Sequence, residues 1–175
     1  HLVTVTKIKK TNQKNKYVWI VVERNEGARL ANQLQRMCEY NQGLDIIVVD
    51  GNSSDGTQKL LLGGTIEIAT LLVSKAGMGF STDLQIGLIY ALRNGYAGVI
   101  TVDGNGKDSC ERIDKFIDSL NLGYDYVQGS RFIAGGGHMN TPILRLLAIK
   151  LLAAPSAHFF SRHKITDPTN GFRGY

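Results

Sequence analysis

Short apolar runs rich in β-branched residues alternate along the chain with helical patterns, and this alternation restricts the fold more than any other feature. We expect buried strands at residues 17–22, 44–49, 70–73, 99–102 and 124–127. A helical periodicity of apolar side chains, or a helix-start signal, follows each of the first four runs. Strands that alternate with helices form a largely parallel sheet covered on both faces. We therefore predict an α/β fold with three layers, α/β/α, around a mostly parallel central sheet.

The length and the charge distribution indicate one domain with a basic leader. A chain of 175 residues fits a single domain. Residues 1–16 contain five lysines and no acid, and the 15 basic residues after them balance 15 acidic ones. We expect a poorly ordered lysine-rich leader at 1–16 and a single domain at 17–175. The initial histidine and the end at Tyr175, directly after a motif, lead us to expect a piece of a longer protein.

Two carboxylates follow apolar runs directly. Asp50 comes after the run at 44–49, and Asp103 comes after the run at 99–102. A charge is costly in the hydrophobic middle of a strand, and open α/β sheets bind their ligands at the carboxyl ends of the strands. We therefore expect Asp50 and Asp103 to face one shared crevice.

Cations gather in the last third of the chain, where six basic residues accompany one acid from Arg131 onward. Basic side chains bind pyrophosphate, and carboxylates accept hydrogen bonds from base N–H and ribose hydroxyl groups. The crevice therefore suits a sugar nucleotide. We expect Glu26 and Asp50 to meet the nucleoside. Lys107, Arg131 and Arg173 are the candidates for the pyrophosphate.

Four segments carry a family resemblance, and they read VVDGNSSDGT, TVDGNGKD, VQGSRF and DPTNGFRGY in chain order. Together they resemble family 2 glycosyltransferases, in particular the branch of dolichyl-phosphate mannose synthase and polyprenyl-phosphate sugar transferases. The resemblance runs from about residue 17 to residue 175. It implies a Rossmann-like GT-A fold and an inverting sugar transfer from a nucleotide-diphosphate sugar. The implied acceptor is a polyprenyl phosphate or a cell-surface glycan precursor of envelope polysaccharide synthesis.

The resemblance also implies roles for individual residues. Glu26 resembles the ribose contact and Asp50 a base contact. Asp103 resembles the first acid of the metal-binding Asp-x-Asp motif. Arg131 resembles a phosphate or sugar contact, and Arg173 resembles a phosphate clamp.

The chain departs from the family pattern at the metal motif and at Gly51, where the family has a second aspartate. Asn105 replaces the second acid of Asp-x-Asp, and Lys107 replaces a polar residue that often helps to hold the metal. A divalent cation, Mg²⁺ or Mn²⁺, would rest on Asp103 and Asn105. Our hypothesis is that Lys107 takes over part of its task by neutralising the pyrophosphate. The alternative is a weakened metal site with Lys107 pointing to solvent.

Asp167 has two alternative roles, and with Asp103 it forms our pair of catalytic candidates. A phosphate acceptor is already anionic and needs no strong base, whereas a hydroxyl acceptor needs a base, for which Asp167 is the best candidate. In the other interpretation, Asp167 only orients Arg173.

The segment after residue 128 is expected to form a loop and then a helix. The glycine-rich loop at 129–141 is either a connector or a lid over a ligand. The apolar stretch 143–154 is shorter than the roughly 20 residues that cross a bilayer, so we expect a helix in the core or at an anionic membrane surface. Cys38 and Cys110 show neither metal nor disulfide spacing, which indicates thiols. We therefore expect a cytoplasmic protein at the cytoplasmic face of a membrane.

Two other functions remain open from the sequence. One is a nucleotidyltransferase or another nucleotide-binding α/β transferase, although the chain has no Walker loop and no G-x-G-x-x-G turn after its first strand. The other is a catalytically weakened sugar-nucleotide binding protein, for which Asn105 and Lys107 are the evidence. We expect no nucleic-acid partner, because no stacking aromatics accompany the lysines of the leader.

Overall fold

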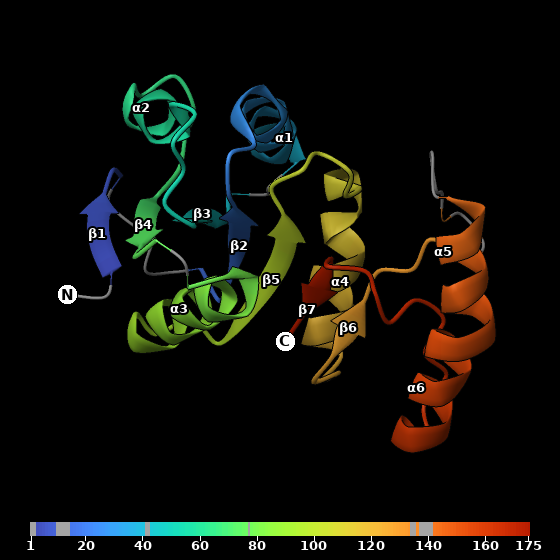
Figure 1. Cartoon of the computed structure of the whole chain (residues 1–175). Helices are drawn as coiled ribbons and strands as arrows, with labels where there is room; N and C mark the ends of the chain where they lie inside the picture. The colour runs from blue at the N-terminus through green and yellow to red at the C-terminus, as the bar shows by residue number, and fades with distance from the viewer. Residues whose placement is uncertain (1–2, 10–14, 41–42, 77, 134–135, 137–141) are drawn as a thin grey trace.

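The computed structural model describes residues 3–9, 15–40, 43–76, 78–133, 136 and 142–175, and these contain a seven-stranded sheet. The strands are β1 (Val3–Lys7), β2 (Tyr17–Glu23), β3 (Asp45–Asp50), β4 (Thr70–Ser74), β5 (Gly98–Asp103), β6 (Val127–Gln128) and β7 (Arg173–Gly174). Their order across the sheet is β1-β4-β3-β2-β5-β7-β6 (Figure 1). The central strands β4, β3, β2 and β5 are parallel, while β1 and β7 are antiparallel to their inner neighbours. The predicted α/β fold with a parallel core is confirmed, and it is consistent with a Rossmann-like GT-A fold.

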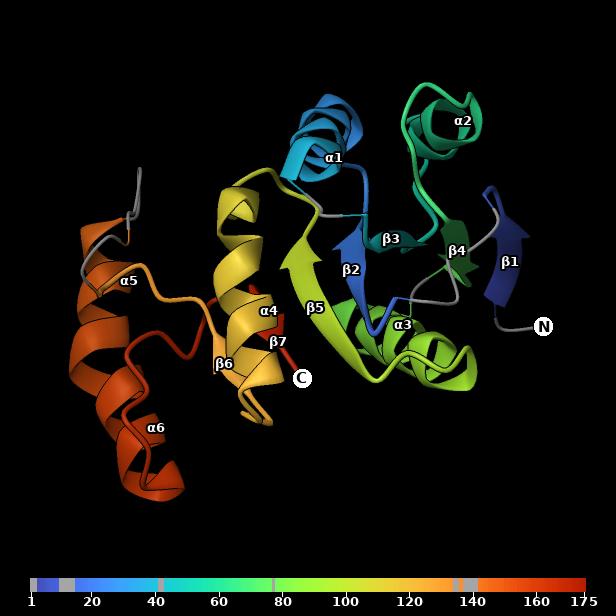
Figure 2. The same ribbon diagram turned by 180° about the vertical axis from the view of Figure 1, so that it is seen from behind.

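The path of the chain through the sheet decides which face each helix covers. From β2 the chain moves to β3 and β4 in one direction, through α1 (Gly27–Tyr40) and α2 (Thr57–Leu62), and it returns past β2 to β5 through α3 (Phe80–Arg93). Parallel crossovers are right-handed, so this reversal sends α3 to the other face. Figures 1 and 2 show α1, α2 and α4 (Ile113–Asn121) on one face and α3 on the opposite face. Open α/β sheets bind ligands where the strand order reverses, which here lies between β2 and β5.

Each face of the sheet has its own apolar core, and both cores fix β2. On the α1/α4 face, Phe172 stacks on Phe116 and Trp19 with ring centroids 4.0 Å and 5.9 Å apart. Phe172 thereby anchors the end of the chain. On the other face, α3 approaches so closely that a Cβ on Gly87 would lie 2.7 Å from Cγ2 of Ile20. The carboxyl ends of the central strands therefore form a firm base for a site.

The edges of the sheet differ from the prediction. The strand expected at 124–127 is reduced to β6, and Tyr124 and Tyr126 are exposed. The leader expected to be poorly ordered contributes β1, which pairs with β4. Its alternating valines and threonines favour a strand despite the nearby lysines. The expected loop at 129–141 lies mostly outside the described residues, so the lid hypothesis is not tested.

The helix expected to end at residue 154 runs on to Ser161. It consists of α5 (Ile143–Ala148), the π-helical turn η2 (Ile149–Ala153) and α6 (Ala154–Ser161). In the π turn the N–H of Ala154 donates to the carbonyl of Ile149, so the bonding pattern has already shifted before Pro155, which has no N–H. By length and composition alone, these 19 residues could cross a membrane, with a mean hydropathy of 1.5. The expectation that this segment is too short was therefore wrong.

Candidate functional site

The carboxyl ends of β2, β3 and β5 lie side by side and carry the acids of the site. Glu23 on β2 stands opposite Asp50 on β3, and Val22 stands opposite Asp103 on β5. Neighbouring strands are about 4.8 Å apart, so Asp50 and Asp103 lie at one edge of the sheet, two strands apart. The two acids lie at a common edge, as expected. The expectation that they face one shared crevice is wrong, because their side chains point to opposite faces of the sheet and Asp50 is fully buried.

The two acids differ in the face toward which they point, because side chains alternate along a strand. Val48 packs into the core under α1, and Asp50, two residues later, points to the same face. Val102 belongs to that core as well, so the next residue, Asp103, points to the α3 face. A ligand on the α3 side of the edge therefore meets Asp103 first.

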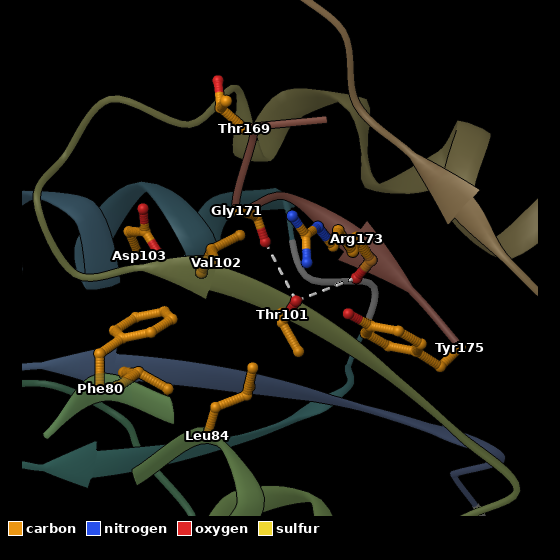
Figure 3. A pocket seen from close by; sticks show the side chains of 10 residues that line it. Phe80, Leu84, Thr101, Val102, Asp103, Thr169, Gly171, Arg173 and Tyr175 are labelled. Atoms are coloured by element: carbon orange, nitrogen blue, oxygen red, sulfur yellow. Dashed lines mark hydrogen bonds between the residues drawn. The ribbon is translucent and has the colours of Figure 1, made fainter. Parts of the chain in front are cut away.

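Asp103 lines a pocket of about 130 Å³ between β5, α3 and the end of the chain (Figure 3). Arg173 lines the same pocket, and Phe80 and Tyr175 contribute aromatic walls. Burial raises the pKa of Asp103 above its ordinary value, and the charge of Arg173 opposes this shift only in part. A carboxylate, a guanidinium and aromatic rings together suit a ligand with phosphate and sugar groups.

The segment before Arg173 is held tightly over the tip of β5. The guanidinium donates from Nε to the carbonyl of Asn170 and from Nη2 to the carbonyl of Pro168, both at 2.9 Å. A Cβ on Gly171 would lie 2.6 Å from Asp103 Oδ1, so a side chain at residue 171 would force the Asp103 carboxylate or the tail to shift. Arg173 therefore lies near Asp103, and its role as a phosphate clamp stays a prediction.

Asp167 binds Arg131. Arg131 donates from Nε to Asp167 Oδ2 at 2.7 Å and from Nη2 to Oδ1 at 2.8 Å, and its backbone N–H donates to Oδ2 at 3.2 Å. Burial alone would raise the pKa of Asp167, but these hydrogen bonds outweigh it and lower the pKa below its ordinary value. The expectation that Asp167 orients Arg173 is wrong, because the carbonyl groups described above hold that guanidinium. Asp167 orients Arg131 instead.

The loop after β5 is closed by its own side chains. Asn105 Oδ1 accepts the backbone N–H of Lys107 at 3.0 Å, and Asp108 Oδ2 accepts the backbone N–H of Asp103 at 3.1 Å. No side chain caps the following 3₁₀ turn, η1 (Cys110–Arg112). Burial raises the pKa of Asp108 to about 6. Lys107 is exposed and its charge favours the ionised form of Asp103, so it lies close to that acid.

The described residues do not by themselves form the metal site that the family resemblance implies. No three histidine, cysteine, aspartate or glutamate side chains gather within the described part of the chain so that they could hold a metal ion. Asn105 already uses its oxygen inside the loop. Lys107 adds a positive charge beside Asp103, which disfavours a second cation there.

Asp50 forms a buried carboxyl pair with Glu23, a residue that sequence reasoning missed. Asp50 is 0% exposed, and its Oδ1 accepts hydrogen bonds from Ser53 N and Oγ, both at 2.7 Å. Burial and the nearby Asp50 charge raise the pKa of Glu23 to about 8, and the protonated Glu23 can donate to Asp50, whose Oδ2 has no other described partner. Both oxygens of Asp50 therefore face protein groups. An acid at the end of the run 17–22 is the signal that could have identified Glu23.

Glu26 lies just before α1, close to the same edge. Its Oε2 forms an ion pair with Arg29 Nε at 2.9 Å. Its charge also contributes to the raised pKa of Asp103. The structure therefore brings Glu26 near Asp103, and its contact with ribose stays a prediction.

Comparison with known proteins identifies a relative by sequence. The chain is 30% identical over 161 residues to polyprenol monophosphomannose synthase of Mycolicibacterium smegmatis. The match covers 89% of this chain and 60% of the relative. No protein-family profile matches the chain.

Proposed function

We propose that this chain, a homologue of family 2 glycosyltransferases, transfers a sugar from a nucleotide-diphosphate sugar to a polyprenyl phosphate. The resemblance expected from the four motifs is confirmed by the homology. The chain spans 60% of the length of the relative, so activity, substrates and partners are proposals. The observation that carries them is the placement of Asp103 and Arg173 around one pocket, beside the reversal of strand order.

In the proposed reaction, an oxygen of the acceptor phosphate attacks the anomeric carbon opposite to the leaving group. The bond between that carbon and the diphosphate oxygen breaks, and its electron pair leaves with the nucleoside diphosphate. Negative charge therefore grows on the diphosphate. Fixed cations stabilise such charge without reorganising during the reaction, and Arg173 and Lys107 are the candidates beside Asp103.

The contacts of Asp167 favour a phosphate acceptor over a hydroxyl acceptor. Its two carboxylate oxygens are bound by Arg131, and its pKa is lowered, so it is a poor base. A phosphate nucleophile needs no proton removed. We assign Asp167 the task of positioning Arg131. The sequence made Arg131 a candidate for the pyrophosphate of the donor, and we propose instead that it contacts the acceptor phosphate.

The helix at Ile143–Ser161 supports contact with a membrane. Only 6% of the 18-residue apolar stretch within this helix is buried. The large apolar side chains that it exposes are Ile143, Leu144, Leu147, Leu151, Leu152, Phe159 and Phe160. Lys150 Nζ lies 5.2 Å and Arg131 Cζ lies 5.5 Å from the centroid of the Phe132 ring. The ring therefore connects the helix to Arg131, the proposed contact of the acceptor phosphate.

The cytoplasmic face is the proposed location of the site. Cys38 and Cys110 are free thiols, as is usual in a reducing compartment. Basic residues of the same region, such as Arg145 and Lys164, complement anionic lipid. We expect the full chain to float with vesicles that contain anionic lipid, and a chain that stays with the soluble fraction would count against this location.

Binding of a sugar nucleotide without transfer is the second candidate. The residues around Asp103 form an incomplete set of metal ligands, because the family pattern has a second acid where this chain has Asn105. This favours binding without transfer. Product formation separates the two functions.

The test incubates the full chain with vesicles that contain polyprenyl phosphate and with radiolabelled UDP-glucose, UDP-N-acetylglucosamine or GDP-mannose. We expect labelled lipid in the organic phase with one donor, and none without polyprenyl phosphate. Donor binding without labelled lipid would favour the binding protein. Neither binding nor product with any donor would contradict both candidates.

A further inference from the structure

Asp83 in α3 carries a carboxylate that the reaction described above does not use. It is 4% exposed, and its Oδ1 is shielded from solvent without a hydrogen-bond partner among the described residues. Burying an unpaired carboxylate is costly, so one that a native protein retains needs an explanation, such as a role in binding. An acid in the first turn of a helix interacts favourably with the helix dipole. An exposed acid would gain the same interaction without the cost of burial.

The carboxylate of Asp83 stands beside the tip of β3. A Cβ on Gly51 would lie 3.0 Å from Asp83 Oδ2 and 3.3 Å from Cβ of Arg24. Gly51 takes the place of the second aspartate in the family pattern. Helix α3 therefore places an acid beside the tip of β3, which lacks the second aspartate of the family pattern.

Ser74 at the end of β4 is a second unsatisfied group at this place. It is 3% exposed, and its Oγ has no described partner. Ser74 follows Val73, the strand partner of Asp50, so it stands next to Gly51. Leu72 packs in the core under α3, and Ser74, two residues later, points to the same face. Two buried polar groups therefore face the α3 side of one sheet edge without partners among the described residues.

The distance from this place to the phosphate candidates suits a nucleotide. The tips of β3 and β5 are two strands apart, which is about 10 Å. This is comparable with the distance between the base and the diphosphate of an extended nucleotide. A diphosphate beside Asp103, Arg173 and Lys107 would place the base near Asp83.

We propose that Asp83 accepts a hydrogen bond from an N–H group of the donor's base, with Ser74 as a second contact. Guanine and uracil both present such N–H groups at the edge of the ring. The inference rests on the proposed function and adds the residue that recognises the base.

The test measures binding of GDP and UDP to the full chain by calorimetry, for the native protein and for Asp83→Asn. A hydrogen bond to a charged group predicts a Kd that is about 10- to 100-fold weaker for Asp83→Asn. Asp114→Asn is the matched control, because Asp114 lies in the first turn of α4 on the opposite face and also has an oxygen without a described partner. The control should keep the native Kd. Unchanged binding by Asp83→Asn would overturn the inference.

Two further measurements distinguish a base contact of Asp83 from a ribose contact and from a structural role. If the 2′-deoxy forms of the nucleotides bind more weakly to the native chain but not to Asp83→Asn, Asp83 contacts the ribose, and the base assignment is wrong. Without ligand, Asp83→Asn should raise the Tm, because it removes an unpaired buried charge. A lowered Tm together with native binding would assign Asp83 a structural role.

Ser74→Ala supplies an independent variant, for which we expect a smaller loss of affinity. Native affinity in Ser74→Ala would remove the second contact. The failures of the two proposals are distinct: native protein that binds neither nucleotide contradicts the proposed function, and with it this site. If the native protein binds a nucleotide and Asp83→Asn binds it with the same Kd, this inference alone is contradicted.

Discussion

Gly171 lies against Asp103 so closely that a Cβ on residue 171 would stand 2.6 Å from Asp103 Oδ1. This contact joins the end of the chain to the tip of β5. The pocket around Asp103 also includes Arg173, two residues after this glycine. The pocket therefore depends on the absence of one side chain.

We expect Gly171→Ala to displace either the tail or Asp103. Overpacking of this kind costs about 1–3 kcal/mol of stability, and sugar transfer should fall by roughly 10-fold or more. Urea unfolding and transfer rates measure the two effects. Gly63→Ala is the control, because Gly63 ends α2 with φ −69°, which alanine adopts readily. A native transfer rate in Gly171→Ala would show that the close approach is not needed.

Asp167→Asn should lower the stability at neutral pH by about 1–3 kcal/mol, since it leaves part of the charge of Arg131 uncompensated. The pKa of Asp167 is lowered in the folded state, so its stabilisation is present above the ordinary value of about 3.9 and is lost as the pH falls through the folded pKa. The difference in Tm between native protein and variant should therefore shrink between pH 7 and pH 3. An equal difference at both pH values would contradict the ion pair.

The same variant separates a positioning role of Asp167 from a base role. If Asp167 positions Arg131, Asp167→Asn raises the KM for polyprenyl phosphate and leaves the pH profile of kcat in place. Loss of the acidic limb of that profile, where protonation of a base would lower kcat, would point to a base instead.

Glu23 predicts an unusual dependence of stability on pH. Its folded pKa of about 8 lies above the unfolded value of about 4.3, so the folded state keeps a proton that the unfolded state loses between these values. Stability therefore falls as the pH rises through this window, by up to about 1.4 kcal/mol per pH unit. Glu23→Gln keeps a donor toward Asp50 without titrating, and should reduce this slope in urea unfolding from pH 5 to pH 8. Glu39→Gln, exposed in α1, should keep the native slope. Equal slopes in all three proteins would refute the buried pair.

The sequence predicts the central strands and their terminal acids because burial on both faces leaves a continuous apolar run, and a charge can only follow it. Asp50 and Asp103 were found in this way. The pairing of Arg131 with Asp167 was not, because these residues are 36 positions apart and meet only through the tertiary fold. Asp83 and Asp108 look like ordinary helix-start acids, and only their burial reveals them.

Lys107→Ala tests whether the ammonium supports the leaving diphosphate. Loss of this charge should lower transfer by about 10- to 100-fold, and native activity should persist in part with EDTA. Lys115→Ala, exposed in α4, is the control. Full dependence on Mg²⁺ or Mn²⁺ with a harmless Lys107→Ala would return the task to a metal ion.

The most direct test of the donor site is the rate of sugar transfer to polyprenyl phosphate for Asp103→Asn, Arg173→Ala and the exposed control Lys59→Ala. If the pocket that Asp103 and Arg173 share binds the donor, both site variants lose about 100-fold or more in kcat/KM while the Tm stays within a few degrees of the native value. The control keeps its activity. Folded site variants that transfer sugar at the native rate would contradict the account.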